Sequence, residues 1–152
     1  MKKIVVVLFL VLFAKAEKVE VEAKNVYADE ANRFVEFTGN ATVIKGKDRL
    51  NAQKITVYID EQGQPLKYVA SGDVKVKISL NQKQYNASGN ALTYEAKDQK
   101  YILEGNAFLT EIDTDRKIYG EKIEANQING TYSVNGKELE PAKFIFQIED
   151  IK

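Results

Sequence analysis

Few side chains in this sequence could do chemistry. The 152 residues include no histidine and no cysteine, so the usual zinc ligands, the thiol nucleophile and the common proton shuttle at neutral pH are missing. The segment "EIDTDR" offers Glu111, Asp113 and Asp115 as calcium ligands, but it lacks the glycine and the bidentate glutamate of an EF-hand loop. We interpret it as a solvated hairpin turn, and we expect no metal, no cofactor and no catalytic residue.

The pattern that remains is apolar, and its chemistry is burial from water. After Glu17, apolar and polar residues alternate with period two over nearly the whole chain, which is typical of half-buried β-strands. We expect strands at residues 19–24, 34–43, 51–59, 66–80, 91–94, 101–110, 118–125, 130–134 and 144–148. One shared face of these strands forms either a packed core or the lining of an apolar groove. The candidate lining residues are Val35, Phe37, Ala41, Val43, Leu50, Ile55, Val57, Tyr68, Ala70, Val74, Val76, Ile78, Leu92, Tyr94, Tyr101, Leu103, Ala107, Leu109, Ile118 and Ile123.

Two short units recur along the chain. Gly39, Gly72 and Gly105 are 33 residues apart, and each is followed by Asn or Asp and then by Ala or Val. Between them an apolar-x-small-x-x-apolar unit returns, as in Leu50-x-Ala52-x-x-Ile55. Such alternation predicts hairpins stacked along one axis. The glycines either bend the strands into two facing layers or relieve crowding in a sandwich core, and both readings predict a two-layer β fold.

The N-terminus has the layout of a secretory signal peptide. Lys2 and Lys3 precede an apolar run at residues 4–14, and Ala14-Lys15-Ala16 is a small-x-small cleavage site. The run is shorter than the roughly 18 residues that a membrane span needs. We therefore expect cleavage after residue 16, a single mature domain at residues 17–152 and a periplasmic location. An uncleaved membrane anchor is the alternative.

Charge and cysteine content limit the possible partners. The mature chain would carry 19 basic and 22 acidic residues, a net charge of −3, which is no footprint for nucleic acid or for an anionic membrane surface. Without cysteine there is no disulfide framework, so the fold must depend on packing alone.

The ordered recurrence of "FTGNATV…LNAQKITVYID", "ASGDVKV" and "LEGNAFL…IYGEKIEAN" resembles the LptA/OstA-like family of periplasmic lipopolysaccharide transport proteins. The resemblance covers residues 21–126. It implies an all-β, V-shaped antiparallel β-jellyroll, open at both ends, that binds the lipid A part of lipopolysaccharide in its interior. It also implies a non-enzymatic carrier that bridges inner- and outer-membrane complexes, with head-to-tail self-association and with LptC-like and LptD-like proteins as partners.

The terminal strands are the expected partner edges. Unpaired strand edges are templates for strand addition, and the residues concerned are Val19, Val21, Phe144, Phe146 and Ile148. In the alternative, the charges of Glu20, Glu22, Lys24 and Glu149 blunt these edges and keep the protein monomeric.

Three other functions stay open at this stage. The first is a membrane-anchored, LptC-like component. The second is a periplasmic β-repeat scaffold that holds no lipid. The third is an enzyme, which the missing histidine, cysteine and carboxylate pair disfavour.

Overall fold

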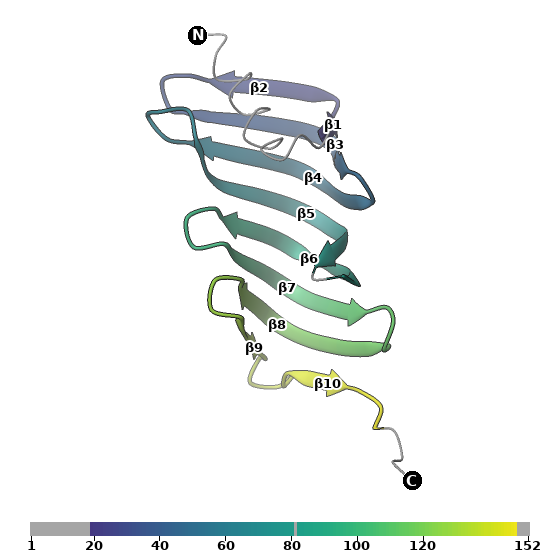
Figure 1. Cartoon of the computed structure of the whole chain (residues 1–152). Helices are drawn as coiled ribbons and strands as arrows, with labels where there is room; N and C mark the ends of the chain where they lie inside the picture. Colours follow the sequence, from purple (N-terminus) through teal and green to yellow (C-terminus); the bar gives the residue numbers. More distant parts are fainter. Residues whose placement is uncertain (1–18, 81, 149–152) are drawn as a thin grey trace.

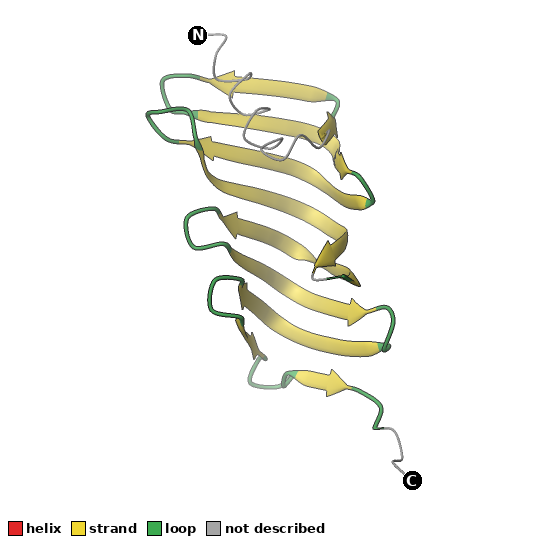
Figure 2. Cartoon of the chain, viewed as in Figure 1, coloured by secondary structure: helices red, strands yellow, loops and turns green. Residues whose placement is uncertain are grey.

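The computed structural model describes residues 19–80 and 82–148, and within them all regular structure is β-strand (Figure 2). No helix in this part of the chain is long and apolar enough to cross a bilayer. The expected signal segment, residues 1–16, lies outside the described residues. The strands are β1 (Val19–Glu22), β2 (Asn25–Asp29), β3 (Phe34–Lys45), β4 (Asp48–Ile59), β5 (Pro65–Leu80), β6 (Lys83–Glu95), β7 (Lys100–Glu111), β8 (Arg116–Asn126), β9 (Thr131–Asn135) and β10 (Lys143–Ile145).

All ten described strands belong to one antiparallel sheet, in which β3 to β8 are stacked in chain order with turns on alternate sides (Figure 1). Six long strands, β3 to β8, form its body. Each edge is made of two short strands: β1 and β2 pair along different parts of β3, and β9 and β10 pair along different parts of β8. The expected all-β fold of stacked antiparallel hairpins is confirmed.

A line of β-bulges crosses the sheet and explains the recurring glycines. At Gly39-Asn40, Gly72-Asp73 and Gly105-Asn106, two residues of one strand oppose a single residue of the next. Both residues of each pair have positive φ, from 81° to 85° for glycine and from 48° to 57° for Asn or Asp. These are the residue types that tolerate left-handed backbone. Bulges bend and twist a strand, so these glycines mark bends.

The bulges also explain why two different units alternate along the chain. On β3 the inward residues Phe37 and Ala41 are four residues apart, because the bulge adds one residue between them. Their partners on β4, Ile55 and Ala52, are only three apart. Inward residues that are paired with each other therefore have different spacings in the sequence. They appear as a glycine unit on the bulged strand and as an apolar-x-small-x-x-apolar unit on the next strand.

The line of bulges divides the sheet into two walls. Wall A comprises residues 25–29, 34–38, 54–59, 65–71, 91–95, 100–104, 122–126 and 131–135, and wall B comprises residues 19–22, 41–45, 48–52, 74–80, 83–89, 107–111, 116–120 and 143–145. Buried side chains of both walls pack in one cluster, with Val35, Phe37 and Ile55 from wall A against Ala41 and Val74 from wall B. A smaller cluster around Leu103, Ala107 and Ile123 follows toward the C-terminal end.

Several strands differ from the expected bounds. Lys83–Glu95 is much longer than the expected 91–94, because its polar Asn and Ser residues are held in the ladder by neighbours on both sides. Asn25–Asp29 was not expected as a strand of its own; its "NVYAD" sequence is mostly exposed at the edge. The last described strand, Lys143–Ile145, is shorter than the expected 144–148.

Candidate functional site

Three apolar rows run across the interior from one edge of the sheet to the other. Each row consists of residues that are directly paired, strand after strand. The first, on wall A, is Ala28, Val35, Val57, Tyr68, Tyr94, Tyr101, Ala125 and Tyr132. The second, also on wall A, is Val26, Phe37, Ile55, Ala70, Leu92, Leu103, Ile123 and Val134. The third, on wall B, is Val21, Val43, Leu50, Val76, Ala87, Leu109, Ile118 and Phe144.

The structure brings the twenty candidate lining residues together on this one face. Sixteen of them lie in the three rows. Ala41, Val74 and Ala107 flank the bulges, and Ile78 lies opposite Tyr85 near the outer end of wall B. Sequence reasoning missed Ala87 and Val134, which occupy the same rows, and the buried Ile59. Ala87 could have been found, since it begins one of the apolar-x-small-x-x-apolar units.

Exposure separates core residues from accessible ones. Ala41 and Val74 have no exposed surface, and Val35, Phe37, Ile55, Val57, Ala70, Leu103, Ala107 and Ile123 are also buried. These residues hold the walls together. The partly buried members are the ones that a ligand could touch, namely Val43, Leu50, Tyr68, Val76, Ile78, Leu92, Tyr94, Tyr101, Leu109 and Ile118.

Three tyrosines form a ladder in the first row. The ring centroids of Tyr68 and Tyr94 are 5.8 Å apart, and those of Tyr94 and Tyr101 are 4.6 Å apart. Burial raises the pKa of Tyr68 and of Tyr101 to about 12, and the neighbouring Tyr94 adds to both shifts. Asp48, in wall B, also raises the pKa of Tyr101. With pKa values this high, the phenols of Tyr68 and Tyr101 are neutral at physiological pH.

Charge is concentrated at one end of wall B, where Glu111 is buried. Lys83 Nζ lies 3.2 Å and Arg116 Nε 3.7 Å from its carboxylate oxygens, and the Thr114 hydroxyl donates a hydrogen bond to it. The Thr114 hydrogen bond is the main reason that the Glu111 pKa lies below its usual value. Asp115 pairs with Lys117 at 3.7 Å. Among the described residues no group of three or more His, Cys, Asp or Glu is placed to hold a metal, and "EIDTDR" forms the β7–β8 turn.

The expected partner-edge residues lie at or beyond the two ends of the sheet. Val19 and Val21 are on β1, where Val19 is buried and Val21 is partly buried. Phe144 is on β10 and is about half exposed, whereas Phe146 and Ile148 follow β10 outside any strand and are exposed. The inward rows are also open at the edges: Val26 is 61% and Tyr132 62% exposed.

The sheet and its rows define a jellyroll-like all-β protein with an apolar interior that is open at both edges. A family model described as "LptA/(LptD N-terminal domain) LPS transport protein" matches residues 20–131. The chain therefore belongs to this family of lipopolysaccharide (LPS) transport proteins, which are not enzymes.

Individual relatives agree with this assignment. The lipopolysaccharide export system protein LptA of Escherichia coli K12 is 26% identical over 147 residues, covering 88% of this chain and 75% of the relative. The protein of the same name from Shigella flexneri matches equally well. The crystal structure of LptH from Pseudomonas aeruginosa, described as the LptA homologous periplasmic component of the lipopolysaccharide transport device, superposes with a TM-score of 0.73. The two sequences are 14% identical, and the superposition covers 87% of this chain and 96% of LptH. This similarity supports the fold.

Proposed function

We propose that this protein is a periplasmic carrier that holds the acyl chains of lipopolysaccharide between its two walls. The observation that carries the proposal is the uninterrupted run of paired apolar side chains from one edge of the sheet to the other. The accessible members, such as Val76, Tyr94 and Leu109, are the proposed contacts with the acyl chains. The buried members, such as Ala41 and Val74, are assigned to the core.

The energetics of such a site are simple. Removing acyl chains from water contributes about 0.8 kcal/mol for each CH₂ group, so several chains supply ample affinity without a polar anchor. The inward residues of the three rows are all apolar or tyrosine. A uniform lining lets a ligand move along it, because no single position binds it much more tightly than the next.

The open edges support end-to-end association. β1 and β2 run antiparallel to β3, and β9 and β10 run antiparallel to β8. Stacking the β9–β10 edge of one molecule on the β1–β2 edge of the next therefore keeps strand directions alternating and continues the apolar rows. Such a head-to-tail contact builds an open chain of molecules rather than a closed oligomer. We assign the same edges to the LptC-like and LptD-like partners, through strand addition.

The mature protein in this proposal is residues 17–152, one domain released into the periplasm by cleavage after residue 16. The open apolar interior favours a carrier over a scaffold that holds no lipid. A scaffold needs partner edges but no accessible apolar lining.

A charge placed on the lining tests the proposal. Tyr94→Glu should abolish co-purification of the mature protein with lipopolysaccharide, because the carboxylate would face the acyl chains. Thr93→Glu is the matched control: Thr93 is the adjacent residue, is also partly buried and points to the outer face, and this variant should retain lipid. Circular dichroism and thermal melting would verify that both variants fold. Equal retention by both variants would favour the scaffold.

A further inference from the structure

The outer face of wall B has a concentration of cations without acidic partners. Lys47, Arg49, Lys75 and Lys77 lie on β4, β5 and the β3–β4 turn, and Arg49 is paired directly with Lys77. Across the residues that the structure describes, none of the four takes part in an ion pair. Arg49 and Lys77, directly opposite on neighbouring strands, are like charges that repel each other, and an anion between them would offset that repulsion.

The outer face of wall A is arranged differently. There Lys54 pairs with Glu36 at 3.1 Å, and Lys100 pairs with Glu124 at 3.2 Å and with Glu95 at 3.7 Å. Cations outside wall A are thus largely neutralised within the protein. The excess positive charge is a local property of wall B.

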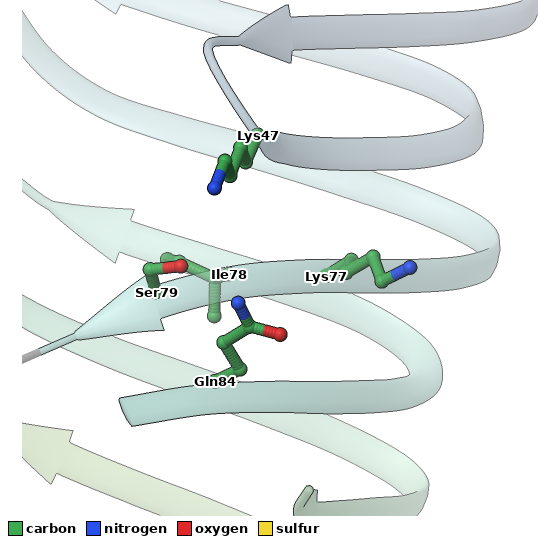
Figure 3. Close-up of a pocket in the computed structure, with 5 residues that line it drawn as sticks. All are labelled: Lys47, Lys77, Ile78, Ser79 and Gln84. Atoms are coloured by element: carbon green, nitrogen blue, oxygen red, sulfur yellow. The ribbon is translucent and has the colours of Figure 1, made fainter. Parts of the chain in front are cut away.

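These cations surround two adjoining hollows. The first, of about 330 Å³, is lined by Lys47, Lys77, Ile78, Ser79 and Gln84. In Figure 3 the Lys47 side chain reaches from the β3–β4 turn toward β5, and the Gln84 amide extends from β6 toward the same strand. The Asp48 carboxylate, next to Lys47 in the chain, accepts a hydrogen bond from the Ser79 N–H at 3.0 Å. Among the described residues neither Lys47 nor Lys77 forms an ion pair.

The second hollow shares Lys77 with the first and continues along the outer face. It is lined by Arg49, Asn51, Lys75, Val76, Lys77, Asn86, Ala87, Ser88 and Phe108. Amides and hydroxyls between cations provide donors for sugar hydroxyls, while Lys and Arg provide charge-assisted hydrogen bonds to phosphate. The Phe108 ring, whose centroid lies 4.8 Å from that of the Tyr119 ring, adds an apolar surface to the second hollow.

We propose that these two hollows form a binding site for a phosphorylated saccharide, namely the head group of the glycolipid whose chains lie between the walls. This inference depends on the proposed function for the identity of its ligand. Ile78 connects the two regions, since it belongs to the inward face and also lines the first hollow. A head group attached to chains that lie against wall B would reach Lys47 and Lys77 by passing over the C-terminal end of β5, near Leu80.

The test compares charge-removal variants on two glycolipids. Lys47→Gln/Lys77→Gln and Arg49→Gln/Lys75→Gln should each lower affinity for purified lipopolysaccharide about tenfold and leave affinity for the dephosphorylated lipid unchanged. Lys67→Gln/Lys97→Gln, which removes two exposed charges outside the hollows, should bind both lipids like the unaltered protein. Unchanged lipopolysaccharide affinity in the first two variants would overturn the inference while the proposed function stood.

A second experiment tests the two hollows with a ligand that has no acyl chains. Deacylated, phosphorylated saccharide should shift the backbone amide resonances of Lys77, Ser79 and Gln84 in the unaltered protein, and added salt should weaken the effect. If the protein bound neither glycolipid but these resonances shifted, the proposed function would fail and the hollow would stand as a phosphosaccharide site. If the resonances did not move, the site assignment would be wrong.

Discussion

A Cβ atom added to Gly105 would lie 2.7 Å from the Cβ of Asn90 on the neighbouring strand. Gly105 also has φ of 81°. Two independent constraints therefore require glycine at this bulge, and the same pair of constraints holds at Gly72, where the obstacle is Gln53. The 33-residue repeat of glycine is a repeat of this bend.

Gly105→Ala should lower the free energy of unfolding by about 2–4 kcal/mol, because left-handed backbone strain adds to overpacking. Gly46→Ala is the matched control: Gly46 also has positive φ, 59°, but nothing lies within 4 Å of an added Cβ. It should cost only about 1 kcal/mol. Urea denaturation measures both, and equal losses would show that the contact with Asn90 contributes nothing.

The tyrosine ladder predicts loss of stability at high pH. The folded-state pKa values of Tyr68 and Tyr101, about 12, exceed the ordinary value of 10.0. The unfolded chain therefore loses these protons first, and their contribution to stability is complete below about pH 10 and disappears as the pH rises to about 12. Tyrosinate absorbance should show phenols that titrate late, and Tyr101→Phe should lose less stability over this range. Identical pH profiles would contradict the placement of Tyr101.

The lowered pKa of Glu111 predicts a loss of stability at low pH. Its pKa in the folded protein lies below the ordinary value of 4.5, so its contribution is complete above that pH and is lost as the pH falls through the folded-state pKa. Glu111→Gln should lower stability at neutral pH by about 1.5–3 kcal/mol, the scale of a hydrogen bond to a charged group. The difference between variant and unaltered protein should shrink below pH 4.5. A constant difference would show that the charge of Glu111 is not what stabilises the turn.

End-to-end stacking predicts a specific disulfide. Tyr27 on β2 and Ser133 on β9 are the two ends of one outward row across wall A. If the next molecule continues the sheet in register, Ser133 faces Tyr27 across the joint. Tyr27→Cys mixed with Ser133→Cys should crosslink under mild oxidation, whereas Tyr27→Cys mixed with Lys67→Cys, away from either edge, should not. The absence of dimers in the first mixture at any concentration would rule out this joint.

The fold was predictable because its signals are local. Period-two alternation placed the candidate residues on one face, and the spacing of Gly39, Gly72 and Gly105 predicted stacked hairpins. The choice between bending and relief of crowding could not be made from spacing. It depends on φ, which is positive at these three glycines, and on close approaches such as that of Gly89 to the Leu103 side chain, 2.7 Å from an added Cβ.

Features that depend on lateral pairing were not predictable. Asn25–Asp29 forms a strand because β3 extends past β1 and offers it a partner. The cations outside wall B gather because Arg49 and Lys77, distant in sequence, are paired across β4 and β5. Which lining residues are buried and which are accessible depends on how closely the two walls approach at each row, and the sequence pattern does not contain that distance.

Photocrosslinking in cells tests the central claim most directly. A photoreactive amino acid would replace Leu50 or Leu109 on the inward face, and Thr93 or Ile102 on the outward face, all four being partly buried positions. We expect lipopolysaccharide adducts from Leu50 and Leu109 and none from Thr93 and Ile102. Equal labelling at all four positions, or labelling of the outward pair alone, would contradict transport of the acyl chains between the two walls.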